Sequence, residues 1–296
     1  MEIKRIFSNI ENPIHFNFPI TKFCNYKCSY CIANNFSGSN AHIEYKNIIE
    51  KLKIIDDEYI VCLSGGEPTM HPECSEIINE LLHCKNLKIL HIFTNLSKEI
   101  NFFKQFVNNT QYHKLEILFS FHPEYFNEKI FNKMLEFNFV FDKFSVNIMM
   151  HNKQKYWDDI ERIIHFCKNN NIDYSLNMIR STSKYPVIYT NKFKERFFKY
   201  FDESNYHEYL FIEYNDGSIT EMKPDDIIIK GMNHFKDFKC EAKYWNIDYS
   251  GKITNICTNE IVPHIIPRNY FKQYQKCILD ECDCTSKIEF KKERYE

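Results

Sequence analysis

Three cysteines near the N-terminus have the residue type and the spacing to hold an inorganic centre. Cys24, Cys28 and Cys31 follow one another as C-x3-C-x2-C, with an aromatic residue, Tyr30, directly before the last. A short loop can wrap such closely spaced thiolates onto one zinc ion or one iron–sulfur cluster, and both centres commonly take four ligands. With three thiols, one position stays open to a ligand. The spacing therefore favours a reaction site over a structural site, although a distant Cys or His would complete a zinc knuckle.

A glycine turn follows the first cysteines in the sequence. The apolar run Tyr59 to Leu63 predicts a short strand, and Ser64 leads into Gly-Gly-Glu-Pro at residues 65–68. The two glycines allow the backbone to approach a ligand closely, and the proline ends the strand. The glycine turn and the cysteine loop are thus candidates for one binding site.

A second group of cysteines lies near the C-terminus. Cys240 and Cys257 bracket a predicted hairpin, and Cys277, Cys282 and Cys284 follow as C-x4-C-x-C. The hairpin would bring two thiols together, and the tail would supply the others. Five thiols exceed the four that one cluster uses, so one is either packing or a free thiol able to donate a hydrogen atom. Zinc is the alternative occupant.

Together these motifs resemble those of radical S-adenosylmethionine (SAM) enzymes with a C-terminal auxiliary cluster domain of the SPASM or shortened twitch type. The interval from Gly251 to Cys257 is one residue longer than the usual pattern. The resemblance implies a four-iron, four-sulfur (4Fe–4S) cluster on Cys24, Cys28 and Cys31, with SAM bound at its open iron. It also implies reductive cleavage of SAM to a 5′-deoxyadenosyl radical that abstracts a hydrogen atom from a substrate. One auxiliary 4Fe–4S cluster and an external one-electron reductant, such as flavodoxin or ferredoxin, are further implications.

The elements that must position these motifs alternate between strand and helix. Apolar strands separated by amphipathic helices are typical of a parallel sheet with helices outside it. The resemblance narrows this α/β prediction to a partial (β/α)6 barrel at residues 1–205, followed by a small, hairpin-rich auxiliary iron–sulfur domain at residues 206–296. The predicted strands are residues 16–21, 59–63, 87–93, 115–119, 144–149 and 173–178, and the predicted helices are residues 43–55, 74–84, 100–107, 126–137, 156–167 and 191–201.

Ligands of parallel β/α folds sit at the carboxyl ends of the strands. The resemblance implies that polar residues at these ends contact SAM. The expected SAM-binding residues are Tyr30, Gly65, Gly66, Glu67, Asn95, Ser120, His122, Asn147 and Met178, and the expected metal ligands are Cys24, Cys28, Cys31, Cys240, Cys257, Cys277, Cys282 and Cys284. The remaining cysteines, Cys62, Cys74, Cys84 and Cys167, are expected in the core as small apolar side chains.

Composition limits the partners. The net charge is −2 and charged residues are interspersed, so a nucleic-acid partner is not expected and modification of tRNA is disfavoured. No apolar run approaches a membrane span, and the N-terminus lacks the features of a signal peptide, which predicts a cytoplasmic protein without a membrane partner.

The substrate is the least determined property. Only 23 residues precede Cys24, so we expect no N-terminal peptide-binding domain. This favours a small molecule, such as a sugar, aminocyclitol or nucleotide derivative, that undergoes dehydrogenation or epimerisation. A peptide-modifying maturase is the second hypothesis, and a zinc-stabilised binding module, which gives no role to the glycine turn, is the third.

Overall fold

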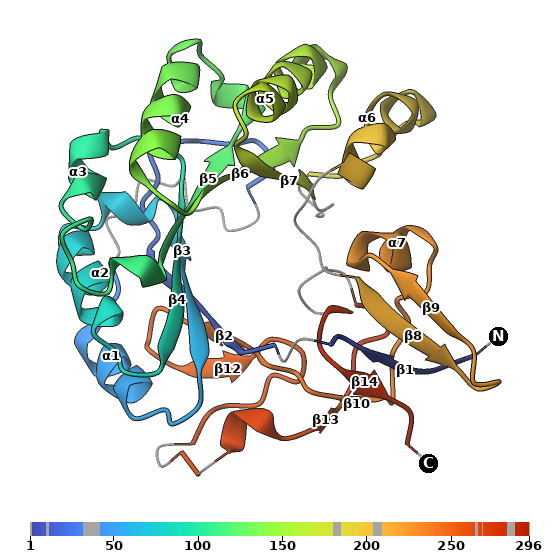
Figure 1. The fold of residues 1–296 in the computed structure, drawn as a ribbon. Helices are drawn as coiled ribbons and strands as arrows, with labels where there is room; N and C mark the ends of the chain where they lie inside the picture. Colours follow the sequence, from blue (N-terminus) through green and yellow to red (C-terminus); the bar gives the residue numbers. More distant parts are fainter. Residues whose placement is uncertain are drawn as a thin grey trace.

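The computed structural model of the protein is shown in Figure 1. It describes residues 2–9, 12–31, 42–179, 185–203, 209–263, 266–267, 269–282 and 288–295.

Six parallel strands form the body of the larger sheet, with β2 to β7 side by side in chain order. Residues on one face of these strands, such as Phe16, Val61 and Leu90, are fully buried in one hydrophobic core. The predicted six-stranded partial (β/α) barrel is confirmed. The strands are β2 (Ile14–Thr21), β3 (Tyr59–Gly65), β4 (Leu87–Thr94), β5 (Leu115–Phe121), β6 (Phe144–Met150) and β7 (Asp173–Met178).

Helices cover the outside of this sheet (Figure 1). The helix expected at residues 126–137 begins only at Lys129, because Pro123–Tyr125 first form a 3₁₀ turn at the end of β5. The helices are α1 (Lys46–Lys53), α2 (Cys74–Leu82), α3 (Ile100–Lys104), α4 (Lys129–Val140), α5 (Trp157–Asn169) and α6 (Asn191–Glu203), and the 3₁₀ turns are η1 (Pro68–Met70), η2 (Tyr112–Lys114), η3 (Pro123–Tyr125), η4 (Gln154–Tyr156) and η5 (Tyr270–Lys272).

A second, antiparallel sheet combines the two ends of the chain. Its order is β13-β10-β14-β1-β8-β9, so that β1, near the N-terminus, lies between strands from the C-terminal third (Figure 1). Its elements are β1 (Ile3–Phe7), β8 (Leu210–Tyr214), β9 (Ile219–Met222), α7 (Pro224–Ile229), β10 (Lys239–Cys240), β13 (Gln275–Lys276) and β14 (Lys292–Glu293).

The hairpin of β11 (Tyr244–Ile247) and β12 (Ile253–Asn255) extends the barrel sheet, because β11 pairs with β2 in parallel. Its turn is closed by Asp248, which accepts hydrogen bonds from Ser250 and from the Lys252 N–H. Strand pairing thus crosses the proposed boundary at residue 205 in both directions. The division into residues 1–205 and 206–296 stays a prediction.

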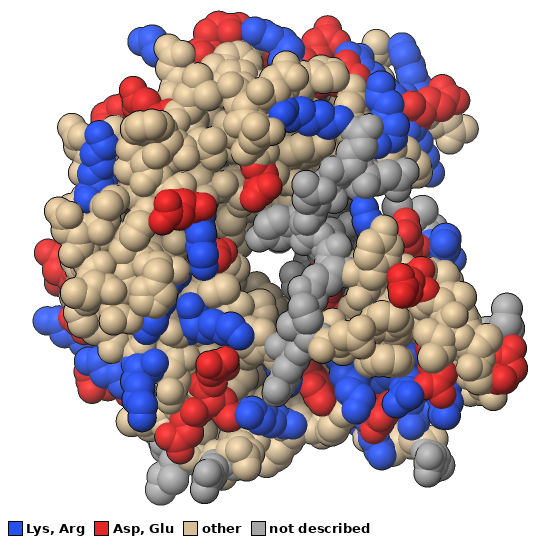
Figure 2. All heavy atoms as spheres, in the orientation of Figure 1, with Lys and Arg blue, Asp and Glu red and all other residues tan. Residues whose placement is uncertain are grey.

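The surface agrees with the dispersed charge of the sequence. On the face seen in Figure 2, acidic and basic side chains alternate without a large patch of one sign. Within the described part of the chain, every helix is too short or too polar to cross a membrane.

Candidate functional site: three thiols at a cavity over the barrel

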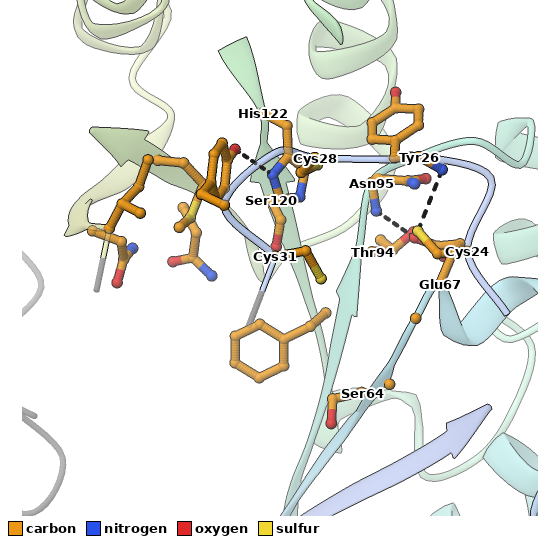
Figure 3. Close-up of a pocket in the computed structure, with 18 of the residues that line it drawn as sticks. Cys24, Tyr26, Cys28, Cys31, Ser64, Glu67, Thr94, Asn95, Ser120 and His122 are labelled. Atoms are coloured by element: carbon orange, nitrogen blue, oxygen red, sulfur yellow. Dashed lines mark hydrogen bonds between the residues drawn. The ribbon is translucent and has the colours of Figure 1, made fainter. Parts of the chain in front are cut away.

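The cysteine loop leaves the end of β2 and borders a cavity of about 440 Å³ (Figure 3). Cys28 is buried, and Cys24 and Cys31 are half-buried. The Cys31 N–H donates to the Cys28 carbonyl at 3.1 Å, and the Tyr26 N–H donates to Cys24 Sγ at 3.4 Å. The loop therefore turns tightly and presents all three thiols to one cavity, as predicted from their spacing.

Residues after β5 hold the loop in place, and sequence reasoning missed them. Tyr125 stacks on Tyr26 with ring centroids 4.0 Å apart, and its hydroxyl accepts a hydrogen bond from the Lys27 N–H. Glu124 accepts hydrogen bonds from the N–H and the hydroxyl of Ser29. Their nearness to His122 in the sequence was the one available signal.

The carboxylate of Glu124 also binds a buried histidine. Its Oε1 lies 3.1 Å from His151 Nε2. Although burial raises the pKa of Glu124, the hydrogen bonds from Ser29 and His151 lower it below its usual value. Glu124 is therefore charged near neutral pH, which strengthens its bonds to the loop.

The glycine turn packs against the start of the same loop. A Cβ on Gly65, whose φ is +132°, would lie 2.3 Å from the Thr21 carbonyl oxygen, and a Cβ on Gly66 would lie 2.0 Å from that of Phe23. The N–H groups of Gly66 and Glu67 donate to these carbonyls at 2.7 and 2.8 Å. The close approach that we expected toward a ligand is thus made here to the chain's own backbone.

Glu67 ties the glycine turn to the end of β4. Its carboxylate accepts hydrogen bonds from the hydroxyls of Thr69 and Thr94 at 2.6 and 2.7 Å and from the Asn95 N–H at 2.6 Å. The side chain is almost completely buried, and this burial raises its pKa. With these bonds made inside the protein, Glu67 joins two strand ends at the cavity wall.

All nine residues expected to bind SAM line this one cavity. Tyr30 and His122 are connected by a hydrogen bond of 2.8 Å between the hydroxyl and Nδ1, and burial lowers the pKa of His122 to about 4. The imidazole is thus neutral at neutral pH. Individual contacts to SAM stay predictions. The nine residues are Tyr30, Gly65, Gly66, Glu67, Asn95, Ser120, His122, Asn147 and Met178.

The cavity fits the expected groups. Its volume lies within the range of about 300–1,000 Å³ that is usual for small-molecule sites, and three thiols stand on its wall. Within the described residues, no three His, Cys, Asp or Glu side chains converge as the ligands of a single metal ion. Thiols spread along a wall suit a four-iron cluster, in which each thiolate binds a different iron.

Iron binding would change the protonation of these thiols. Burial raises the pKa of Cys24 to about 11 and that of Cys28 to about 12. Both thiols therefore carry protons near pH 7 when no metal is bound. Because a thiol binds metal as the thiolate, cluster assembly on this loop must release protons.

Four of the five C-terminal cysteines lie in two adjoining buried clusters. Cys240 packs with Cys257, Cys277 packs with Cys282, and Leu279 contacts both clusters. A hydrogen bond from Cys282 lowers the pKa of Cys277. The structure thus groups the thiols that the sequence predicted as auxiliary ligands, but Cys284 lies outside the described residues and the ligand set stays a prediction.

A buried cation accompanies these thiols. Lys292 is fully buried, and its Nζ donates to the carbonyls of Ile288 and Phe290 at 3.0 and 2.9 Å. Its charge lowers the pKa of Cys240, secondary to the burial that raises it. No spacing rule could have linked Lys292 to these cysteines, because the strand pairing of β14 with β10 brings them together.

The other cysteines divide into two kinds. Cys74, Cys84 and Cys167 belong to the hydrophobic core, as expected. Cys62 does not pack in that core, and its Sγ lies 3.8 Å from His91 Nδ1. The interpretation of Cys62 as apolar packing is therefore wrong, because alternation along β3 turns it to the opposite face.

Comparison with known proteins agrees with this site. The antilisterial bacteriocin subtilosin biosynthesis protein AlbA of Bacillus subtilis (strain 168) is 30% identical over 87 residues, which are 28% of this chain and 18% of AlbA. The S-adenosylmethionine-dependent nucleotide dehydratase of Selenomonas ruminantium is 34% identical over 86 residues, 29% of this chain and 31% of the dehydratase. These matches span less than a third of either relative.

A solved structure extends the likeness in fold over most of the chain. Native anSMEcpe with bound AdoMet and Cp18Cys peptide superposes with a TM-score of 0.53 at 15% identity, covering 93% of this chain and 79% of that one. The family model of the radical SAM superfamily matches residues 18–190, more than half of the sequence. The chain that places three thiols at the mouth of this barrel belongs to the radical SAM superfamily.

Proposed function

We propose that the protein is a radical SAM enzyme whose substrate is a polar small molecule, such as a sugar, aminocyclitol or nucleotide derivative, and that the outcome is dehydrogenation or epimerisation. Radical SAM enzymes use a 4Fe–4S cluster and SAM, which together supply a 5′-deoxyadenosyl radical able to abstract a hydrogen atom from a C–H bond. Cys24, Cys28 and Cys31 would hold that cluster. The part of this chain is to bind, to orient and to exclude water.

One observation carries the choice of substrate class, namely the polar interior of the barrel below the cavity. Ser64 donates to Asn17, and Asn17 donates to Asn246 on the added hairpin, at 2.6 and 2.8 Å. On the other side Ser175 donates to Asn147 at 2.6 Å. Amide and hydroxyl groups that converge in a concave site are suited to orient a hydroxylated or nitrogen-rich molecule.

The walls of the cavity complement this polar floor. Phe93 and Met149 line the cavity between the polar strand ends. Apolar side chains at these positions would exclude water from a reactive species. The nucleotide dehydratase that matches this chain, by its name, acts on a polar small molecule and depends on SAM.

A peptide substrate is the second candidate. AlbA matches at a similar level of identity, and by its name it serves the biosynthesis of a bacteriocin. Under both candidates we propose an external one-electron donor of the flavodoxin or ferredoxin type, and an auxiliary 4Fe–4S cluster on the C-terminal cysteines.

The first test is iron content and SAM cleavage after anaerobic reconstitution. Wild-type protein should hold about eight irons and a Cys24, Cys28 and Cys31 triple Ala variant about four, since each four-iron cluster takes up to four Cys ligands. Wild-type protein with a chemical reductant should form 5′-deoxyadenosine, and Cys28→Ala should form none. If Cys28→Ala matched wild type, the proposed role of the loop would be wrong.

The second test separates the substrate classes. Pools of nucleotides, aminocyclitols and sugars, and separately pools of cysteine-containing peptides, are incubated with reduced enzyme and SAM. Polar small molecules should increase 5′-deoxyadenosine formation, with a product two mass units lighter or with solvent deuterium incorporated. Stimulation by peptides alone would contradict the small-molecule proposal and favour the maturase.

A further inference from the structure

A row of interacting side chains crosses the interior face of the barrel, one step deeper than the cavity wall. Strand register places Cys62 of β3 beside His91 of β4, and His91 beside Glu116 of β5. Alternation along the strands puts Cys62 and His91 on the same face as Ser64 and Phe93, which line the cavity. The row therefore faces the space beneath the bound cofactor.

The three side chains form a directed chain of contacts. Cys62 Sγ lies 3.8 Å from His91 Nδ1, and His91 Nε2 lies 2.8 Å from Glu116 Oε2. The other Glu116 oxygen pairs with Lys143 Nζ at 2.9 Å. A thiol next to an imidazole that a carboxylate orients is the arrangement of an activated thiol. Although burial lowers the pKa of His91, its hydrogen bonds with Cys62 and Glu116 raise it to about 9.

This row borders open space and is not sealed by packing. The side chains of His91 and Glu116 retain 13% and 21% of their exposure, although both lie on interior strands. Val61 and Leu63, on either side of Cys62 in the chain, point the other way into the hydrophobic core. A small ligand in the barrel can thus approach Cys62 from the interior.

An unpartnered hydroxyl on the same face provides an independent indication of a ligand. Ser145 is more than nine-tenths buried, and its Oγ has no hydrogen-bond partner within the described part of the chain. It alternates with Asn147 and Met149, both of which line the cavity, and it pairs in register with Leu118 of β5. Buried hydroxyls are rarely left without a partner, so a polar group of a ligand is expected here.

We propose that Cys62 is the proton acceptor for a hydroxyl group of the substrate, held as a thiolate by His91 and Glu116, with Ser145 as a hydrogen-bonding group for the same substrate. This inference rests on the proposed function, because it places the substrate in the barrel interior. In the step, the O–H bond of the substrate breaks and both of its electrons stay on oxygen. The proton forms the S–H bond of Cys62, and the His91 imidazolium keeps its charge beside Glu116.

The reactivity of the thiol tests this assignment without a need for turnover. Reconstituted protein is alkylated anaerobically with iodoacetamide at a series of pH values, and modification of Cys62 is followed by peptide mass spectrometry. The groups that face the relay and titrate with it are His15 on β2, whose pKa is lowered by burial and by His91, and Glu116 with its partner Lys143. The midpoint for Cys62 should lie at least about one pH unit below the value of about 8.5 for a free cysteine.

The variant Glu116→Gln keeps the shape of the side chain and removes the charge that stabilises the imidazolium. Its midpoint should move up toward about 8.5, and alkylation near pH 7 should slow about tenfold for each unit of that shift, because the thiolate is the reactive species. Glu136→Gln, on the exposed face of α4, is the matched control and should behave as wild type. Cys167, buried in the core of the same chain, is the internal reference.

Two results would overturn the inference. An identical midpoint in wild type and Glu116→Gln would show that the carboxylate does not act on the thiol. Absence of alkylation at Cys62 in native protein, with full alkylation after denaturation, would show that no ligand can reach it. Failure of the proposed function is measured separately, as loss of 5′-deoxyadenosine formation by the wild-type protein.

Discussion

Gly66 offers the sharpest test of how the glycine turn supports the cysteine loop. In Gly66→Ala, the new Cβ would lie 2.0 Å from the Phe23 carbonyl oxygen and 3.0 Å from the Cys24 nitrogen. Both contacts are with backbone, so no side chain can rotate away to relieve them. The loop must move, and with it the first of the three thiols.

The cost follows from the contacts that this movement breaks. The Gly66 and Glu67 N–H bonds to Thr21 and Phe23 contribute about 1 kcal/mol each. Overpacking of a tight site costs about 1–3 kcal/mol more. We therefore expect a destabilisation of about 3–5 kcal/mol, which corresponds to a melting temperature lower by roughly 6–20 °C for a chain of this size.

The assay compares melting temperature and iron content with those of a matched glycine variant. Gly217→Ala lies in the β8–β9 turn at φ +83°, where no atom is within 4 Å of the added Cβ, so that it carries only the cost of backbone conformation, about 1 kcal/mol. Gly66→Ala should lose the iron of one cluster after reconstitution, whereas Gly217→Ala should keep it. If both variants had equal melting temperatures and full iron content, the steric argument would be refuted.

Three further predictions concern charge. Glu124→Gln weakens the hydrogen bonds to Ser29 by about 1–2 kcal/mol, so iron should leave for a chelator faster than in wild type; an unchanged rate would show that Tyr125 alone holds the loop. Lys292→Met removes a buried positive charge beside the C-terminal thiols, so an auxiliary cluster there should have a more negative reduction potential in a titration followed by electron paramagnetic resonance, and a positive shift would contradict this. His15 and His122 have their pKa values lowered by burial from 6.5 to about 4, so the unfolded chain binds more protons between these values and the free energy of unfolding should fall as pH drops from 6.5 to 4; denaturation at several pH values should show a shallower fall for His15→Gln.

Local sequence patterns were sufficient for the barrel and for the position of its cavity. Apolar alternation located all six parallel strands, and parallel strands necessarily gather their carboxyl ends at one edge. Asn95, Ser120 and Asn147 lie together at the cavity for that reason. The three thiols of the loop were predictable because their spacing within the sequence already limits how far apart they can be.

Contacts that depend on long-range register were not predictable. β1 contains Lys4 and Arg5 and has little apolar periodicity, and it is held by pairing with β8 about two hundred residues later. The hairpin from Tyr244 was expected beside the auxiliary thiols, and it extends the barrel through β2 instead.

The face of a fully buried strand was equally hidden from the sequence. Every residue from Tyr59 to Leu63 is buried, so composition cannot separate the core side of β3 from the interior side. Cys62 was therefore interpreted as packing. The identity of its neighbours, His91 and Glu116, became visible only with the register of β3, β4 and β5.

The place of β1 in the middle of the second sheet has a consequence for biogenesis. Ile6 must wait for its partners Ile212 and Lys292, the second of which lies only four residues before the end of the given sequence. The sheet cannot close while those residues are still inside the ribosome, and contacts of such high sequence separation form slowly. Loading of a cluster onto the C-terminal thiols should therefore be a post-translational event, and a ribosome-stalled nascent chain should accept iron at the first three cysteines alone.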